Sequence, residues 1–236
     1  MNHYNQNLDK NKANFVPLTP ISFLERAKDI YPNYEAVFYQ KRIYTWKKVY
    51  SRCIKFASAL EKHGIGLGDT VSIMAANTPE LFEAHYSIPM TGAVLNPINT
   101  RLDPKTVNYI LQHSDAKAFI VDRQFHKVAK KALEGLSKKI LVIDINDIQA
   151  ELQIVEKIGE LEYENFLNEG NENYIWKKPQ DEWQAISLNY TSGTTGNPKG
   201  VVCHHRGSYL MSTGSAVAWN MPNRLTFLCI VPMFHC

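Results

Sequence analysis

The chain has few cysteines and no long hydrophobic run, and each of these absences excludes a class of protein. Its 236 residues include four cysteines, Cys53, Cys203, Cys229 and Cys236. None forms the short paired spacing that a structural zinc site requires, so we interpret them as reduced thiols. Residues 1–14 are rich in Asn and Lys and lack the apolar stretch of a secretory signal or a membrane span. The sequence therefore predicts a cytoplasmic protein without integral membrane association.

A strong charge of one sign is also lacking. The sequence has 26 basic and 23 acidic side chains, scattered along its length, for a formal net charge of +3 at pH 7. This distribution gives no concentrated positive field for a nucleic-acid backbone, so the sequence predicts no nucleic-acid partner. Apolar residues make up 44% of the chain, which is ample for a globular core. The oligomeric state is unknown from these features.

Strand and helix patterns alternate through the first two thirds of the chain. Thr45 is placed to cap a helix whose apolar residues recur at helical spacing from Val49 to Leu60, and Gly64 is placed to end it. Similar signals predict strands near residues 71–75, 93–95, 118–121 and 140–143, and helices that begin at Thr78, Asp103 and Phe125. This alternation predicts the α/β class, with a largely parallel sheet covered by helices on both faces.

Two further stretches are harder to assign. Residues 149–178 are polar and predict a long connection, in which Tyr163 begins a short helical segment. Near the end of the sequence, the apolar run from Leu225 to Phe234 predicts a strand that enters a loop. A chain that stopped where such a buried strand emerges would leave its neighbours unpaired. The sequence therefore predicts a fragment of a longer protein, with exposed apolar surface.

Residues 190–200 read Tyr-Thr-Ser-Gly-Thr-Thr-Gly-Asn-Pro-Lys-Gly, which concentrates hydroxyl groups and glycines ahead of a lysine. Glycines let backbone N–H groups approach an anion, hydroxyls add hydrogen-bond donors, and the lysine supplies a full positive charge. All three features favour a polyphosphate ligand. The predicted phosphate-binding residues are Thr191, Ser192, Gly193, Thr194, Thr195, Gly196 and Lys199.

This loop differs from a P-loop, in which four residues separate two glycines and the lysine precedes Ser or Thr at the start of a helix. Here two residues separate Gly193 from Gly196, a glycine follows the lysine, and Val201–Cys203 is apolar and β-branched. Such residues favour a second strand, so we expect a loop between two strands and a helix near His205. A P-loop phosphotransferase is a distant alternative. The alternative without a function in binding is an ordinary Ser/Thr/Gly-rich surface connection.

Three other patterns are interpreted as structural. Gly64–Gly68 lies between a helix and a strand, whereas a dinucleotide loop runs from strand to helix, so it predicts a turn. Adjacent His204 and His205 point to opposite sides of an extended segment and have no carboxylate nearby in sequence, so we predict no metal ligand. The lysines between residues 127 and 139 predict a solvated helix face rather than a site for phosphate or a membrane surface.

The loop at residues 190–200 resembles, residue by residue, the signature loop of the adenylate-forming family, which includes acyl-CoA synthetases, firefly luciferase and the adenylation domains of peptide synthetases. Asn96–Leu102 and Asp181–Trp183 resemble stretches around that loop in acyl-CoA synthetases. The resemblance implies the N-terminal portion of the family's large domain, with mostly parallel sheets covered by helices and the C-terminal domain absent. Residues 1–14 are then a polar tail, and residues 15–236 a partial AMP-binding domain truncated at its C-terminal end.

The resemblance implies that the complete enzyme uses ATP to activate a carboxylic acid, with a fatty acid as the leading candidate, to an acyl-adenylate and then to an acyl-CoA. ATP, Mg²⁺ and coenzyme A are the implied cofactor and co-substrates. Pro232–His235 is similar to the next family motif, which implies that His235 lies in the acid pocket. The catalytic lysine and the magnesium and ribose ligands are implied beyond residue 236. Two alternatives stay open: an adenylating relative that transfers the acyl group to a carrier protein or to oxygen, and an inactive nucleotide-binding fragment.

Overall fold

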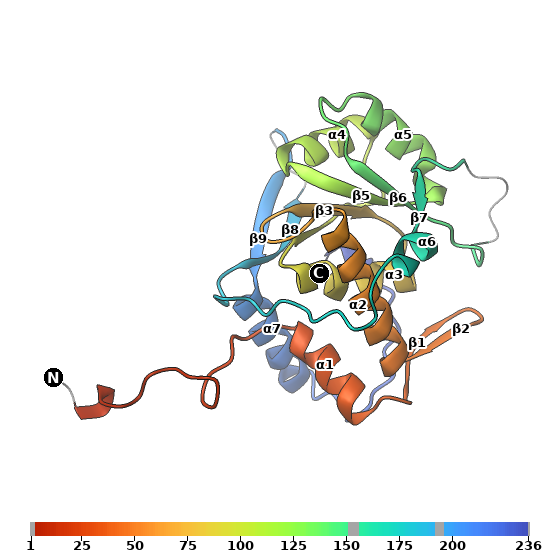
Figure 1. Ribbon diagram of the computed structural model, residues 1–236. Coiled ribbons are helices and arrows are strands. Elements are labelled where there is room, and N and C mark those ends of the chain that lie inside the picture. Colours follow the sequence, from red (N-terminus) through yellow and green to blue (C-terminus); the bar gives the residue numbers. More distant parts are fainter. Residues whose placement is uncertain (1–2, 151–155, 192–195, 236) are drawn as a thin grey trace.

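Strands and helices alternate along the chain, as the sequence predicts. The computed structural model describes residues 3–150, 156–191 and 196–235 (Figure 1). The strands are β1 (Glu35–Tyr39), β2 (Arg42–Thr45), β3 (Thr70–Met74), β4 (Val94–Pro97), β5 (Ala116–Asp122), β6 (Leu141–Ile145), β7 (Leu161–Glu162), β8 (Ala185–Thr191) and β9 (Lys199–His204). The α-helices are α1 (Ile21–Ile30), α2 (Trp46–Lys62), α3 (Pro79–Ser87), α4 (Pro104–His113), α5 (His126–Glu134), α6 (Tyr163–Asn168) and α7 (His205–Ala218). Short 3-10 turns are η1 (His3–Asn5), η2 (Pro89–Thr91), η3 (Arg123–Phe125) and η4 (Met233–His235).

Seven of the described strands form one sheet, in the order β7-β6-β5-β3-β4-β8-β9. Neighbouring strands are parallel throughout, except that β9 runs antiparallel to β8. The other two described strands, β1 and β2, pair as a separate antiparallel hairpin. The mostly parallel sheet predicted from the alternation of elements is therefore confirmed.

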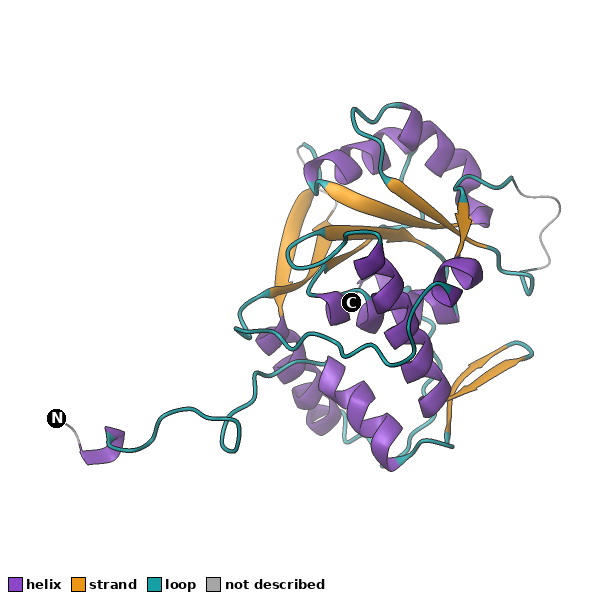
Figure 2. Ribbon diagram, in the orientation of Figure 1, coloured by secondary structure: helices purple, strands orange, loops and turns teal. Residues whose placement is uncertain are grey.

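Helices cover both faces of this sheet (Figure 1 and Figure 2). On one face lie α2, α3 and α6, where Phe56 and Phe166 pack with sheet residues such as Ile73. On the other face lie α4 and α5, where Val107 packs with Phe119. Every residue of β3 is buried, as expected for a central strand of a parallel sheet that is covered on both sides. Functional groups must therefore lie at the ends of the strands rather than on the faces of the sheet.

The helix starts follow from capping residues that the sequence displays. The Thr45 hydroxyl accepts a hydrogen bond from the Lys48 N–H at the start of α2, at 3.3 Å. Thr78 caps α3 in the same way, and Asp103 caps α4. Gly64 follows α2 with φ +77°, a left-handed conformation that glycine adopts without a steric penalty. These predicted boundaries are confirmed.

The order in which successive strands are added to the sheet reverses at β3. The next strand, β4, pairs on one side of β3, whereas β5 pairs on its other side. In open α/β sheets, ligands bind outside the carboxyl ends of the strands near such a reversal. Because β3, β4 and β8 are parallel, the turn after β3 that contains Asn77 and the loop after β8 leave from the same edge. We call this the carboxyl edge and expect the functional site there.

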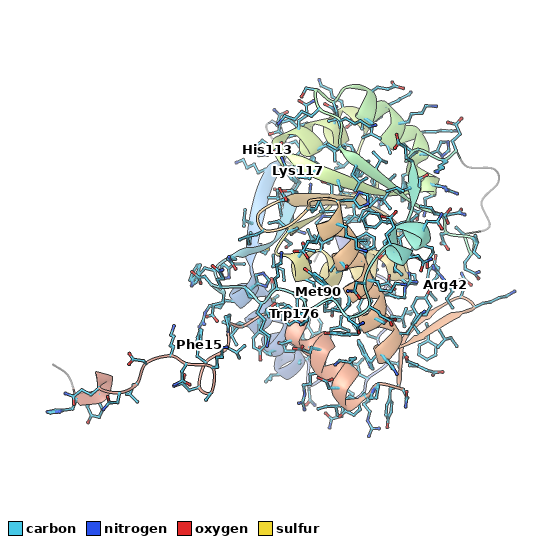
Figure 3. The ribbon with its side chains drawn as sticks, in the orientation of Figure 1. Phe15, Arg42, Met90, His113, Lys117 and Trp176 are labelled. Carbon is cyan, nitrogen blue, oxygen red and sulfur yellow. The ribbon has the colours of Figure 1, made fainter. Side chains whose placement is uncertain are left out.

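The first residues lie outside the packed body. Residues 6–16 are exposed and run outward from α1, with Phe15 on this arm (Figure 1 and Figure 3). α1 lies beside α7, where the rings of Phe23 and Tyr209 stack with centroids 4.7 Å apart. Among the described helices, none combines the length and the apolar character that crossing a membrane requires.

The strand predicted near the end of the sequence is wrong. Residues 225–230 lie in no helix or strand, and the side chains of Leu228 and Ile230 are each 77% exposed. A strand needs a neighbour for its backbone groups, and no described strand pairs with this segment. The backbone carbonyls of Cys229 and Val231 instead accept hydrogen bonds from the side chain of Asn77. Exposed apolar side chains continue on α7, where Met211 is 71% exposed, so the apolar surface expected from the sequence is present.

Candidate phosphate-binding hairpin

β8 and β9 form an antiparallel hairpin at one side of the sheet, and residues 192–198 connect them. The register pairs Tyr190 with Gly200 and Thr191 with Lys199. Since β8 continues the parallel sheet beside β4, the connection leaves from the carboxyl edge. The predicted loop between two strands is thus confirmed, and the strand–loop–helix order of a P-loop is excluded. The helix expected near His205 is α7, which begins at that residue.

Part of the predicted phosphate-binding set lies at the base of this hairpin. Thr191 and Lys199 face each other across the two strands, and both are exposed. Gly196 is exposed as well, and a Cβ atom added to it would meet no atom within 4 Å. The other members lie outside the described residues: Ser192, Gly193, Thr194 and Thr195. The structure thus brings a hydroxyl and a lysine to the mouth of the loop, while phosphate binding itself stays a prediction.

The upstream arm of the hairpin is anchored to α4 through Tyr190. Its hydroxyl lies 2.6 Å from Nδ1 of His113 at the end of α4, and the two rings meet edge to face. Its ring packs against the apolar cluster under α4 and α5, where Tyr109 stacks on His113. Burial, helped by Tyr109, raises the pKa of Tyr190 to about 12, so the hydroxyl keeps its proton at neutral pH. The β8 residue next to Thr191, at the base of the loop, is therefore held by a fixed element.

Glycine at position 200 lets the two arms of the hairpin approach each other. A Cβ atom there would lie 2.9 Å from the Leu188 Cδ1 and 3.5 Å from the Tyr190 Cζ. The first of these distances is too short for real atoms, so any side chain at Gly200 must displace Leu188. Gly200, which follows Lys199 where a P-loop would have Ser or Thr, is therefore required by the close packing of the two arms of the hairpin.

The downstream arm is anchored by two histidines with different partners. The His204 side chain accepts a hydrogen bond from the Gly207 N–H at 2.8 Å and so caps α7. His205 is only 3% exposed, and its Nδ1 lies 2.8 Å from the Thr19 hydroxyl. Burial, followed by the neighbouring His204, lowers the pKa of His205 to about 4. Both histidines therefore fix the start of α7, as a structural role predicts.

Acid is expected to weaken the packing around His205. The unfolded chain binds a proton at the ordinary histidine pKa of 6.5, whereas the folded chain resists protonation until about pH 4. The stability that neutral His205 contributes is therefore complete above pH 6.5 and is lost as the pH falls through this window. In the complete protein, His205→Gln should flatten the decline of the thermal unfolding midpoint between pH 7 and pH 4.5. The control is His63→Gln on the surface; equal pH profiles for His205→Gln and the unchanged protein would contradict the assignment.

Carboxylates gather near the carboxyl edge, yet they have partners within the protein. Asp144 accepts hydrogen bonds from the N–H groups of Ile158 and Gly159 and from Nε of Arg123, at 3.0, 2.9 and 3.3 Å. Glu80, at the start of α3, forms an ion pair with the arginine that begins β2. Within residues 3–150, 156–191 and 196–235, no group of three His, Cys, Asp or Glu side chains could hold a metal ion. The described part of the chain therefore does not fit a magnesium site of its own.

His235, the residue predicted for the acid pocket, lies in η4 and is exposed. Its N–H donates to the Pro232 carbonyl at 3.1 Å, and its ring lies against that of Phe234, with centroids 4.5 Å apart. Phe234 is 7% exposed and so ties the turn to the body. η4 contacts β4, the neighbour of β8 in the sheet. The structure thus places η4 and the end of β8 at adjacent strands, whereas contact of His235 with an acid stays a prediction.

Sequence reasoning missed His113 and Asn77, the two side chains that hold these segments. His113 is 77 residues before its partner Tyr190, and Asn77 is more than 150 residues before the segment it binds. Neither stands in a recognisable motif with its partner. No local signal marks them, because Asn77 lies two residues after the strand predicted at 71–75 and His113 lies within the helix predicted from Asp103.

Comparisons with known proteins bear on the family and the fold of this chain. The family model described as AMP-binding enzyme matches residues 24–236. Acetate–CoA ligase CCL3 of Humulus lupulus is 47% identical over 97% of this chain and 42% of its own length. The peroxisomal acetate/butyrate–CoA ligase AAE7 of Arabidopsis thaliana is 43% identical with the same two coverages, 97% and 42%. The solved o-succinylbenzoate CoA synthetase (MenE) of Bacillus subtilis, bound to the acyl-adenylate intermediate OSB-AMP, has a TM-score of 0.73 at 22% identity over 92% of this chain and 50% of its own.

These similarities differ in what they establish. The solved synthetase, at 22% identity, shows a shared fold. The family model extends from α1 to the end of the sequence, and the two curated relatives align with nearly the whole chain. This chain spans 42% of the length of either relative. The chain belongs to the AMP-binding enzyme family, whose adenylate-forming fold it shares.

Proposed function

We propose that the complete protein is an AMP-forming acid–thiol ligase that activates a carboxylic acid with ATP and transfers the acyl group to coenzyme A. The observation that carries this proposal is the hairpin: a hydroxyl- and glycine-rich loop with Thr191 and Lys199 at its base, at the carboxyl edge of a parallel sheet. Family membership and the names of the relatives, both CoA ligases, support the same activity.

The first half-reaction needs control of charge. A carboxylate oxygen attacks the α-phosphorus of ATP, the bond from that phosphorus to the bridging oxygen breaks, and pyrophosphate leaves. Because both reactants are anions, the site must neutralise the β- and γ-phosphates and hold the reacting groups in line. Lys199 supplies a positive charge, and Thr191 supplies a hydroxyl donor. Tyr190 and His113 hold the upstream arm, so that the donors need little reorganisation on binding.

In the second half-reaction, the coenzyme A thiol loses its proton, its sulfur attacks the acyl carbon, and AMP leaves with the electrons of the broken bond. Coenzyme A as the acceptor rests on the names of the relatives. A carrier protein and oxygen are the alternative acceptors, since the loop is compatible with each of them. Mg²⁺ belongs to this proposal as the companion of the ATP phosphates, whose negative charge it would help to neutralise.

We propose a small carboxylic acid as the substrate rather than the fatty acid that the sequence favours. The two relatives are named for acetate and for acetate and butyrate, and they are 47% and 43% identical to this chain. His235, in η4 beside β4, is the described side chain that we place next to the acid. Its ring nitrogens can hydrogen-bond a carboxylate oxygen.

The test uses the complete protein with Mg-ATP and matched concentrations of acetate, butyrate, octanoate, palmitate and benzoate. Acid-dependent ATP–pyrophosphate exchange reports adenylation, and mass detection of the thioester reports transfer to coenzyme A. We expect exchange and thioester formation, with acetate or butyrate giving the highest kcat/KM. Exchange without a thioester would replace coenzyme A by another acceptor, and no exchange with any acid would overturn the proposed activity.

Residues 1–236 alone are proposed to be inactive. The catalytic lysine and the ribose ligands are expected beyond residue 236, and the chain spans 42% of its relatives. The separate chain should therefore give no exchange and bind Mg-ATP weakly in calorimetry. Carboxylate-dependent exchange by residues 1–236 would contradict this part of the proposal.

For the compartment, we retain the cytoplasm as a proposal, although several relatives are named as peroxisomal. A fluorescent protein placed at the N-terminus of the complete protein leaves any C-terminal signal free. Diffuse fluorescence would support a cytoplasmic location, and co-localisation with a peroxisomal marker would instead assign the protein to the peroxisome.

A further inference from the structure

Asn77 stands at a rigid point of the carboxyl edge. It lies three residues after β3, the buried strand between β4 and β5, and directly before Thr78, which caps the helix α3. On one side of it the Thr78 N–H donates to the Ala76 carbonyl at 2.7 Å, and the Thr78 hydroxyl caps α3. These bonds fix the turn around Asn77 between the buried residues Ala75 and Thr78, so its side chain starts from a fixed backbone position.

The side-chain amide of Asn77 makes three hydrogen bonds to the backbone of one distant segment. Its Nδ2 donates to the carbonyls of Cys229 and Val231, at 3.1 and 2.9 Å. Its Oδ1 accepts from the Met233 N–H at 2.8 Å. An amide offers two donors and an acceptor on one planar group, and no carboxylate or hydroxyl can reproduce this set.

The segment that Asn77 holds has little other support. Residues 225–230 lie outside any sheet, and the side chains of Ile230 and Val231 are 77% and 66% exposed. Beyond them, Met233 packs against the core under α2 and α3, and Phe234 is buried. Asn77 therefore fixes the approach to η4 and, through the Met233 N–H, its first residue, while the buried Phe234 anchors the middle of η4.

We propose that Asn77 is a positioning residue for the carboxylic acid: by fixing residues 229–233 to the end of β3, it sets the place of His235 at the carboxyl edge. This inference rests on the proposed function, in which His235 lies beside the acid. Asn77 needs no contact with either substrate. It acts through the backbone of the segment that ends at His235, and the ATP phosphates depend on the separate hairpin of β8 and β9.

The first test is Asn77→Asp in the complete protein, which keeps the size of the side chain but removes both donors. A carboxylate oxygen would then face the Cys229 and Val231 carbonyls. We expect kcat/KM for the acid to fall at least about tenfold, mainly through KM, and KM for ATP to change less than about twofold. Asn108→Asp is the matched control, because the Asn108 amide also donates to a backbone carbonyl, that of Ala132 at 2.7 Å, on the opposite face of the sheet.

A double substitution separates positioning from general damage. If Asn77 acts through His235, Asn77→Asp should add less than about a twofold loss in acid KM to a protein that already carries His235→Ala. Equal losses in the presence and absence of His235 would overturn the proposal. So would unchanged acid kinetics in Asn77→Asp, or a KM for ATP that rises as much as the KM for the acid.

Hydrogen exchange provides a readout that does not depend on activity. In Asn77→Ala, the amide of Met233 should exchange at least about tenfold faster than in the unchanged protein, while amides of β3 keep their protection. Equal exchange at Met233 would overturn the proposed contact even if a variant were too unstable for kinetics. Absence of activity in the unchanged protein would instead contradict the proposed function, so the two failures are distinguishable.

Discussion

Lys199→Met in the complete protein is expected to lower acid-dependent ATP–pyrophosphate exchange about 10- to 100-fold in kcat/KM for ATP. A hydrogen bond to a charged group contributes about 1.5–3 kcal/mol, and each 1.4 kcal/mol corresponds to about a factor of ten. Lys199 begins β9 opposite Thr191, so the register of the hairpin holds its backbone at the mouth of the loop. Methionine keeps most of the length of the side chain and removes the charge.

The matched control for this prediction is Lys127→Met. Lys127 is an exposed lysine on α5, away from the hairpin, and its loss changes the net charge by the same amount. Exchange by the control should stay within about twofold of the unchanged protein. If Lys199→Met stayed within the same range, the assignment of the loop to the ATP phosphates would be contradicted.

The second large effect concerns stability. Arg52 on α2 forms an ion pair with Glu83 on α3, at 2.5 Å, and both side chains are nearly buried, with 5% and 1% exposed. Arg52 also bonds both carboxylate oxygens of Glu164 on α6, at 2.6 and 2.9 Å, and the Tyr163 hydroxyl donates to Glu83 at 3.0 Å. One guanidinium thus connects three helices that cover the same face of the sheet.

Arg52→Met should leave the Glu83 carboxylate buried without a charged partner, at a cost of roughly 3–5 kcal/mol. In a domain of this size, that cost lowers the thermal unfolding midpoint by roughly 10 °C. Adding Glu83→Gln to Arg52→Met should restore part of the loss, because the double variant buries no charge. Lys139→Met, which removes an exposed ion pair with Glu160, should leave the midpoint unchanged.

The stability that Arg52 and Glu83 contribute also depends on pH. Burial raises the pKa of Glu83 from 4.5 to about 7, although Arg52 acts in the opposite direction. The folded state therefore favours the neutral acid, and the associated stability is lost as the pH rises from 4.5 through the folded pKa. Loss of Arg52 raises the folded pKa further, so the deficit of Arg52→Met should be larger at pH 8 than at pH 5.5. A deficit that is equal at both values would contradict this explanation.

Local signals were sufficient to predict most elements of the fold. Thr45 and Asp103 mark helix starts because a cap depends on a side chain and the next three residues. The hairpin was predictable because the β-branched run at Val201 excludes the helix of a P-loop. The helix α1 and the β1–β2 hairpin were not predicted. The two-residue strand β7 was missed as well, since its pairing with β6 leaves no periodic pattern in so short a segment.

Contacts between distant residues could not be predicted in the same way. The apolar run from Leu225 suggested a buried strand, but hydrophobicity gives no information about a free strand edge, and no described strand pairs with it. His113 and Asn77 act on partners that only the folded chain brings near. The order of the strands in the sheet could not be predicted either, because no local sequence pattern indicates that β5 pairs on the opposite side of β3 from β4.

The most direct test of the central claim compares two nucleotides on the complete protein. Calorimetry gives the Kd of ATP and of AMP for the unchanged protein and for Lys199→Met. If the hairpin grips the β- and γ-phosphates, the variant should lose at least about tenfold in affinity for ATP and less than about twofold for AMP, which lacks those groups. Equal changes for both nucleotides, or none for either, would contradict the account.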